Sequence, residues 1–389
     1  MSVLITNAEY TVCLAIMKSL GRKDIDVTVS THINKPTPLS FYSKYYKNKV
    51  FYPSIENGEN EFIQKIISIV KNNNYDVLLP LRESVILPIS KHRNKFAPYV
   101  KIPIAEHEVL EKADDKAQTL KIAEDNDIPI PKTYFIEKTS DIDKIKNEII
   151  FPVIIKPYKG ESAKGVTYAY SEKELKDKYM KVREEFGPSM IQEYVSGTRY
   201  TVAALFNEDS KPRRVCVHKG IRENPITGGP QIFAETVENP EVLNHALKLL
   251  KAMNYYGMAE VEFIADERDK KIKLMEINPR FYDSIWVPIA SGVDFPYLLY
   301  KMAMDGDIKP SFDYKTGIKC RYLLGDMRHL ISVMKGVKTP KYKLGRLQTL
   351  LNFLKFHEDD AHYVFSLDDP KPAIMDFIQI LSKKLRNNK

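Results

Sequence analysis

Cysteine is scarce in this sequence. Three cysteines, Cys13, Cys216 and Cys320, occur among 389 residues, and none belongs to a CxxC pair. An odd and sparse set argues against a disulfide framework and against a structural zinc site, because both need paired or clustered thiols. We therefore interpret all three as buried or incidental thiols.

Long apolar runs are missing too. No stretch approaches the roughly 20 residues that a membrane-spanning helix needs. The first residues, MSVLITNAEY, lack the basic segment and apolar block of a secretory signal peptide. A hydrophobic content of 43% and a charged content of 28% are typical of a soluble globular protein. We expect a cytoplasmic protein with no membrane partner.

Two glycine-rich nucleotide motifs are also absent. The turn after the first expected strand reads TNAEY and not GxGxxG, and the pattern GxxxxGK[ST] does not occur. The sequence therefore argues against a nicotinamide-dependent enzyme and against a Walker-type phosphate loop.

Acidic residues are outnumbered, and the formal net charge is +8. Such an excess can indicate a nucleic-acid partner. The lysines, however, are spread along the chain and mixed with acids, as in SEKELKDKYMKVREE. We expect no nucleic-acid partner, since attraction of anionic substrates such as nucleotides explains the sign equally well.

What is present first is an alternation of strands and helices. Apolar strand-like runs and helix-like runs alternate at Val3–Thr6, Glu9–Leu20, Asp26–Ser30, Glu61–Asn73 and Tyr75–Leu81. This order predicts a parallel sheet with helices on both faces. Further strands are expected at PVIIKP, VTYAY, MIQEYV, RYTVAALF and RRVCVHKG. A chain of 389 residues suits two or three domains.

The sequence predicts three further helices, two of which begin at recognisable capping patterns. A short helix is expected over about residues 114–126. Ser171 followed by Glu174 has the spacing of a capping box. Asn239 followed by Pro240 predicts a helix that runs to about Asn254.

An acidic hairpin is expected from GMAEVEFIAD and KIKLMEINPR, two β-type runs around the turn ERDK. Pairing about this turn places Glu262 opposite Glu276 and Glu260 opposite Asn278. Because side chains alternate along a strand, these four share one face. The opposite face is then a core face of Ala259, Val261, Phe263, Met275 and Ile277. Facing carboxylates repel unless they are solvated or neutralised, and magnesium can neutralise them. An ordinary wet strand face is the alternative, although such a face normally carries lysines among its acids.

The second candidate binding site is the end of an expected strand that carries a lysine. Lys156 ends the apolar run FPVIIKP, where a charge is costly without a partner. The loop PYKGESAKGV follows, and its small residues let backbone N–H groups approach phosphate oxygens. A surface turn with a lysine at its edge is the alternative.

Five segments, in this order, resemble the ATP-grasp superfamily, most closely its carbamoyl-phosphate-synthase-like and D-alanine–D-alanine-ligase-like members. They are DDKAQTLKIAEDNDIPIPKT, FPVIIKPYKGESAKGV, MIQEYVSGTRYTV, GMAEVEFIAD and LMEINPRF, and they cover about half of the chain. The resemblance implies a mixed α/β and α+β architecture. It comprises a preATP-grasp α/β domain at 1–105, an ATP-grasp domain at 106–307 with a mobile lid at about 130–195, and a C-terminal α/β extension at 308–389.

The resemblance also implies a site for ATP. Phosphate contacts are expected from Lys116, Lys156 and a closing loop that contains Lys159, Gly160, Ser162 and Gly165. Adenine would be held by Gln192, Glu193, Tyr194 and Val195. Among these, the Glu193 side chain would accept a hydrogen bond from the adenine amino group.

Metal binding is implied for the acidic hairpin. Glu262, Glu276 and Asn278 would hold two Mg²⁺ (or Mn²⁺) ions, and Arg280 would stabilise the transferred phosphate. The sequence departs from the family at Arg199, where relatives commonly carry an acid that can bind ribose. Glu260 is an additional acid without an assigned role.

The activity implied is ATP-dependent joining of a small carboxylate to an amine through an acyl phosphate, with release of ADP. We expect Arg222 to grip the substrate carboxylate, since arginine can do so with two parallel hydrogen bonds. A nucleotide-binding regulatory or scaffold protein with a decayed site is the alternative. Carbamoyl-phosphate synthesis is disfavoured because it uses two coupled modules. The family is often dimeric, so a homodimer is a further expectation.

Overall fold

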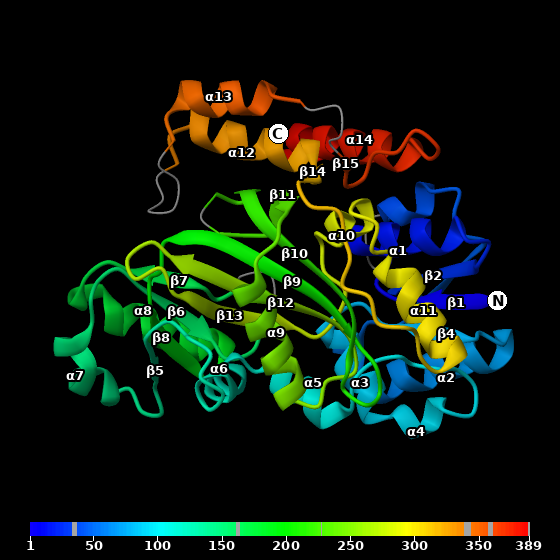
Figure 1. Cartoon of the computed structure of the whole chain (residues 1–389), viewed down its shortest axis with the longest axis horizontal. Coiled ribbons are helices and arrows are strands. Elements are labelled where there is room, and N and C mark those ends of the chain that lie inside the picture. The colour runs from blue at the N-terminus through cyan, green and yellow to red at the C-terminus, as the bar shows by residue number, and fades with distance from the viewer. Residues whose placement is uncertain (33–36, 161–163, 227, 338–343, 357–360, 388–389) are drawn as a thin grey trace.

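The computed structural model describes residues 1–32, 37–160, 164–226, 228–337, 344–356 and 361–387. Within these residues the strands form three sheets, here named A, B and C (Figure 1). No helix of the described part is long and apolar enough to cross a membrane.

Sheet A is the N-terminal parallel sheet, with strand order β3-β2-β1-β4. Its strands are β1 (Ser2–Ile5), β2 (Asp26–His32), β3 (Asn48–Tyr52) and β4 (Val77–Leu79). Val3 belongs to the core that includes α1, whereas its neighbour Leu4 belongs to the core that includes α2. Helices therefore cover both faces of the sheet, which confirms the predicted α/β arrangement.

The helices around sheet A are short. They are α1 (Thr11–Gly21), α2 (Glu59–Asn73), α3 (Glu83–Lys91) and α4 (Arg93–Phe96), with the 3-10 turns η1 (Leu39–Tyr42) and η2 (Ile55–Asn57). The helix expected over about residues 114–126 is α6 (Lys116–Glu124), and an unpredicted helix, α5 (His107–Asp114), precedes it. Asp115 separates them because its carboxylate caps α6, accepting hydrogen bonds from the backbone N–H groups of Ala117 and Gln118.

Sheet C is antiparallel, with order β5-β8-β6-β7, and lies within the predicted lid segment. It contains β5 (Thr133–Phe135), β6 (Val153–Pro157), β7 (Thr167–Ala169) and β8 (Ser189–Glu193), with α7 (Asp141–Ile145), η3 (Lys146–Glu148) and α8 (Glu172–Phe186) beside it. A separate small core joins α8 to this sheet through Tyr179 and Ile155. Half of the predicted capping box is wrong, because the Ser171 side chain makes no capping bond. Glu174 accepts from the backbone N–H groups of Tyr170 and Ser171.

Sheet B has the order β13-β12-β9-β10-β11-β14-β15. Its strands are β9 (Gly197–Phe206), β10 (Pro212–Glu223), β11 (Gln231–Thr236), β12 (Gly257–Asp266), β13 (Ile272–Asn278), β14 (Lys319–Arg321) and β15 (Ala361–His362). Accompanying helices are α9 (Pro240–Ala252), α10 (Trp286–Ala290), α11 (Phe295–Asp305), α12 (Leu323–Met334), α13 (Arg346–Leu354) and α14 (Lys371–Asn387). The predicted start of α9 is confirmed, since Asn239 caps it and Pro240 is its first residue.

The acidic hairpin has the predicted register. Glu260 pairs with Asn278, and Glu262 pairs with Glu276. The prediction for Met275 is wrong. A bulge between the Glu262 and Phe263 pairs leaves Met275 without a partner, and its side chain lines a cavity rather than the core.

The hydrophobic cores cross the predicted domain borders. One core joins Val3 and Val12 to Leu205, Phe281 and Tyr363. In addition, β14 and β15 extend sheet B, so the residues after 307 complete that sheet. The borders at 105 and 307 remain predictions.

Candidate active site

A cavity of about 230 Å³ lies against the acidic face of the β12–β13 hairpin. Strand β6 of sheet C and residues after β4 of sheet A also contribute to its wall. Most of the predicted site residues line it, namely Lys116, Lys156, Gly160, Tyr194, Val195, Glu262, Glu276, Asn278 and Arg280. Ser162 lies outside the described residues.

The acids of the hairpin form one cluster. Asn278 donates to Glu260 (2.9 Å) and accepts from Arg280 (3.2 Å). Burial, reinforced by the nearby Glu262 carboxylate, raises the pKa of Glu260 well above its usual value. Burial also acts on Glu276, but the surrounding cations, with Lys116 foremost, hold its pKa below the usual value. The surroundings therefore shift the pKa values of these two acids in opposite directions.

Two lysines face this cluster. Lys116 Nζ lies 3.5 Å from a carboxylate oxygen of Glu276 and donates to the carbonyl of Gly160 (2.8 Å). Lys156 Nζ donates to the side-chain oxygen of Gln192 (2.8 Å). Burial lowers the pKa of Lys156 to about 8, against the opposing influence of Glu276. Both ammonium groups can reach an anion that enters the cavity.

Arg280 is held in place from the N-terminal part of the chain. Its Nε donates to the carboxylate of Glu83 at 2.6 Å, and its Nη1 donates to the Phe281 carbonyl. Although burial opposes the charged form, Glu83 raises the pKa of Arg280. Arg280 therefore presents a fixed positive charge to the cavity.

Arg199 occupies an unexpected position among the acids. It forms ion pairs with Glu262 and with Glu223 (2.9 Å), and it donates to the Gly229 carbonyl (3.1 Å). The residue that replaces the family's acid thus neutralises one of the predicted metal ligands.

The donor set fits a divalent cation only with rearrangement. Within the described ranges, no three His, Cys, Asp or Glu side chains are already grouped for a metal. Lys116 and Arg199 instead balance Glu276 and Glu262. Carboxylate and amide oxygens are the ligands that Mg²⁺ prefers, and Glu262, Glu276 and Asn278 supply them on one wall of the cavity.

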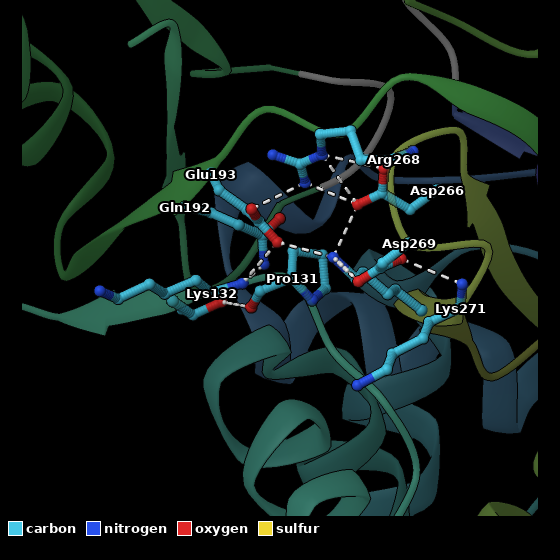
Figure 2. A network of polar contacts seen from close by, with 10 residues as sticks. Pro131, Lys132, Gln192, Glu193, Asp266, Arg268, Asp269 and Lys271 are labelled. Carbon is cyan, nitrogen blue, oxygen red and sulfur yellow. Dashed lines mark hydrogen bonds and ion pairs between the residues drawn. The ribbon is translucent and has the colours of Figure 1, made fainter. Parts of the chain in front are cut away.

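The Glu193 side chain makes its contacts away from the cavity. Its carboxylate accepts from the backbone N–H of Lys132 (2.9 Å), from Lys273 (3.0 Å) and from Arg268 (2.8 Å). Figure 2 shows this network joining Glu193 to the hairpin turn and to Asp266. Three donors thus hold the Glu193 carboxylate, and its contact to adenine stays a prediction.

The glycine-bearing loop is described at its two ends. Lys159 is exposed and does not line the cavity, whereas Gly160 does. Gly165 has a φ of +75°, and a Cβ there would lie 2.8 Å from the ring of Phe186. Only glycine fits this position without displacing the ring.

Arg222 is also misplaced by the prediction. Its Nε lies 2.6 Å from a carboxylate oxygen of Asp326 on α12, its side chain is 8% exposed, and it does not line the cavity. A buried carboxylate that satisfies the guanidinium leaves no room for a substrate carboxylate. His218 is buried as well, and burial lowers its pKa to about 3, which suits a neutral strand residue stacked on Tyr282.

Arg82 and Asp283 are among the cavity residues that the sequence reasoning missed. Arg82 lies 3.3 Å from Asp283 and stacks on the ring of Tyr10 at 3.8 Å. A signal was present, because Arg82 follows strand β4, and parallel sheets bind ligands at the carboxyl ends of their strands.

Comparisons with known proteins agree with this arrangement. A model of the ATP-grasp domain matches residues 113–284. The D-alanine–D-alanine ligase of Acetivibrio thermocellus is 30% identical over 182 residues, which cover 41% of this chain and 47% of that protein. The D-aspartate ligase of Enterococcus faecium is 23% identical, over 56% of this chain and 58% of that protein. The chain thus spans about half the length of these two relatives.

Solved structures share the fold at low identity. The biotin carboxylase of Campylobacter jejuni superposes with a TM-score of 0.67 at 17% identity, covering 82% of this chain and 74% of that chain. The L-amino acid ligase of Bacillus licheniformis superposes with a TM-score of 0.63 at 15% identity, covering 79% and 77%. Residues 113–284 of this chain therefore form an ATP-grasp domain.

Proposed function

We propose that the protein is an ADP-forming ligase that uses ATP to join a small carboxylate to an amine. The observation that carries the proposal is the cavity itself, where Lys116, Lys156 and Arg280 face Glu262 and Glu276. Such a mixture suits a polyphosphate held by cations of the protein and by a divalent metal.

ATP would enter with its phosphates near Lys116 and Lys156, and with its adenine near Tyr194 and Val195. Mg²⁺, when bound, neutralises phosphate charge and orients the transferring group. Glu262, Glu276 and Asn278 would hold it. These roles follow the family resemblance and are compatible with the positions of the side chains.

The substrate carboxylate would then attack the terminal phosphorus and form an acyl phosphate, and ADP would leave. Arg280 would stabilise the charge on the transferred group, since Glu83 keeps it charged and oriented. An amine attacks the acyl carbon, and inorganic phosphate departs. Positioning and charge stabilisation would supply most of the rate, because no covalent bond to the protein forms.

The substrate carboxylate needs a partner other than Arg222, which Asp326 already binds. Arg82 lines the cavity beside Asp283 and comes from the carboxyl end of sheet A. We assign Arg82 to this role: it would exchange Asp283, whose side chain is 32% exposed, for the substrate carboxylate, so the preATP-grasp part of the chain would select the acid.

The test is release of ADP from ATP and Mg²⁺ with amino acids and small amines, supplied singly and in pairs. ADP should form only when a carboxylate and an amine are both present. Glu276→Gln should abolish it, whereas Glu267→Gln, in the exposed hairpin turn, should leave it unchanged. Nucleotide binding without such ADP release would favour the alternative, a nucleotide-binding regulatory or scaffold protein. Absence of both binding and turnover would indicate a decayed site.

A further inference from the structure

Exposed apolar side chains gather on the last helices of the chain. Of 23 large hydrophobic residues that are exposed in the described part, 15 lie between residues 323 and 381. In Figure 1 these helices, α12, α13 and α14, lie along the upper edge of the molecule, on the outer side of strands β11 and β14. The cavity lies elsewhere, beside the β12–β13 hairpin.

The exposed residues form helical stripes. On α13, Leu347, Leu351 and Leu354 are 70%, 49% and 59% exposed, whereas Thr349 on the opposite side is 2% exposed. The spacings of four and three residues place the leucines on one face. The other two helices carry corresponding stripes, made of Leu323, Ile331 and Met334 on α12 and of Ile374, Phe377, Ile378 and Leu381 on α14.

The net charge of the chain is concentrated in the same region. Residues 308–389 contain 16 lysines and arginines against 8 acids, whereas the 43 basic residues before them are matched by 43 acidic ones. Basic and acidic residues are thus balanced before residue 308, and the net excess of the chain lies after it. Half of this excess, four of eight charges, lies on α12, α13 and α14, and the rest lies on the other residues after 307.

Three of the described acids of this region are buried, whereas Asp313 is exposed. Asp326 binds Arg222 and Arg321, Asp369 binds Lys18, and Asp376 accepts from Tyr322. Asp368, which is more exposed, pairs with Arg22 of α1. Five basic residues in the described part of residues 323–382 are exposed, namely Arg328, Lys335, Arg346, Lys355 and Lys371. The outer surface is therefore both apolar and basic.

We infer that α12, α13 and α14 dock this protein onto an anionic lipid surface. Amphipathic helices that combine an apolar face with basic residues lie in the plane of such a surface, with their apolar side chains among the acyl chains. A second copy is a poor occupant, because it would bring the same positive charge to the contact. A nucleic acid would match the charge but would leave the leucines unused. The inference revises the expectation of no membrane partner and does not depend on the ligase activity.

The experiment is flotation of the whole chain with phosphatidylcholine vesicles, prepared with and without phosphatidylglycerol. Binding should require the anionic lipid and should weaken as salt is raised. The triple variant Leu347→Gln, Leu351→Gln, Leu354→Gln should lower vesicle binding at least about tenfold, because three leucines lose their apolar contact. Glutamine preserves helix propensity, so the circular dichroism spectrum should not change.

A matched control uses an exposed apolar residue elsewhere. Ile150→Gln, at a side chain that is 77% exposed near sheet C, should leave vesicle binding unchanged.

Failure of the wild-type chain to bind anionic vesicles would overturn the inference. So would a dimer in solution that the triple variant converts to a monomer, since the stripes would then face a second copy. Binding to single-stranded DNA and to vesicles that both survive the triple variant would show that charge alone acts.

Discussion

Lys156 carries its charge in surroundings that favour the neutral form. It ends strand β6 inside the cavity, and burial brings its pKa down to about 8. Polyphosphate beside it would favour the ammonium again, so nucleotide binding and proton binding are linked at this residue.

Affinity for ATP should therefore fall as the pH rises above about 8, by up to about tenfold per pH unit, because binding must then take up a proton. Lys156→Arg should bind with little change between pH 7 and 9.5, since arginine stays charged. Calorimetric titration with Mg²⁺–ATP measures this. The control Lys248→Arg, at an exposed lysine, should keep the wild-type slope. Identical slopes in all three proteins would contradict the assignment.

The effect of Lys156 on stability changes with pH in the direction opposite to its effect on ATP affinity. The unfolded chain holds the proton of Lys156 up to its ordinary pKa near 10.5, whereas the unliganded folded protein releases it near 8. Between these values the unfolded state binds more protons, so the free energy of unfolding contributed by Lys156 rises with pH.

At the scale of elements, the turn of the β12–β13 hairpin is fastened to the end of β8 (Figure 2). Lys273 bridges Glu193 (3.0 Å) and Asp266 (2.7 Å), and Arg268 spans the same two acids from the outside. Hydrogen bonds from Arg268 and Lys273 lower the pKa of Asp266, and those from Lys132 and Lys273 outweigh burial to lower that of Glu193. Their contribution to stability is present above about pH 4 and is lost as the pH falls further.

Lys273 and Arg268 should contribute differently to the free energy of unfolding. Lys273→Met leaves the carboxylate of Asp266, which is 0% exposed, without its buried partner and should lower the free energy of unfolding by roughly 3 kcal/mol. Arg268→Met, at a side chain that is 51% exposed, should cost at most about 1 kcal/mol. Urea denaturation at pH 7 measures both, with Lys271→Met in the same turn as a control. Equal losses in the free energy of unfolding for the Lys273 and Arg268 variants would show that the buried lysine contributes no more than the exposed arginine.

Local patterns predicted much of these elements. Strand parity placed Glu260, Glu262, Glu276 and Asn278 correctly, because pairing about a short turn fixes the register. It failed at Met275, since a bulge inserts one residue without any mark in the apolar pattern. Partners distant in sequence were also beyond local reasoning. Nothing near Arg222 indicates that Asp326, more than 100 residues later, neutralises it.

At the scale of the whole molecule, the cavity is assembled from parts that are far apart in sequence. Glu83 opens α3 beside sheet A, yet it orients Arg280, 197 residues away. The ATP-grasp domain alone therefore lacks part of the wall that would hold the acid.

Glu83→Gln should lower the turnover of the proposed ligase roughly ten- to hundredfold, because Arg280 loses the charge that fixes its position. Affinity for Mg²⁺–ATP should change less than turnover, since the ion pair of Glu83 is with Arg280 and not with Lys116 or Lys156. Initial rates of ADP release and calorimetric titration give the two values. Glu59→Gln, which removes an exposed partner of Lys91, should affect neither. A loss of nucleotide affinity as large as the loss of turnover would argue against a positioning role.

The ion pair between Lys18 and Asp369 has a consequence for synthesis on the ribosome. Both side chains are buried, and Lys18 also donates to the Val364 carbonyl and to Ser366. Until residues 364–369 have emerged, α1 contains a lysine whose native partners have not yet been made. The part of α1 around Lys18 is thus among the last surfaces to be covered, and in the meantime the nascent chain exposes a surface that chaperones can bind.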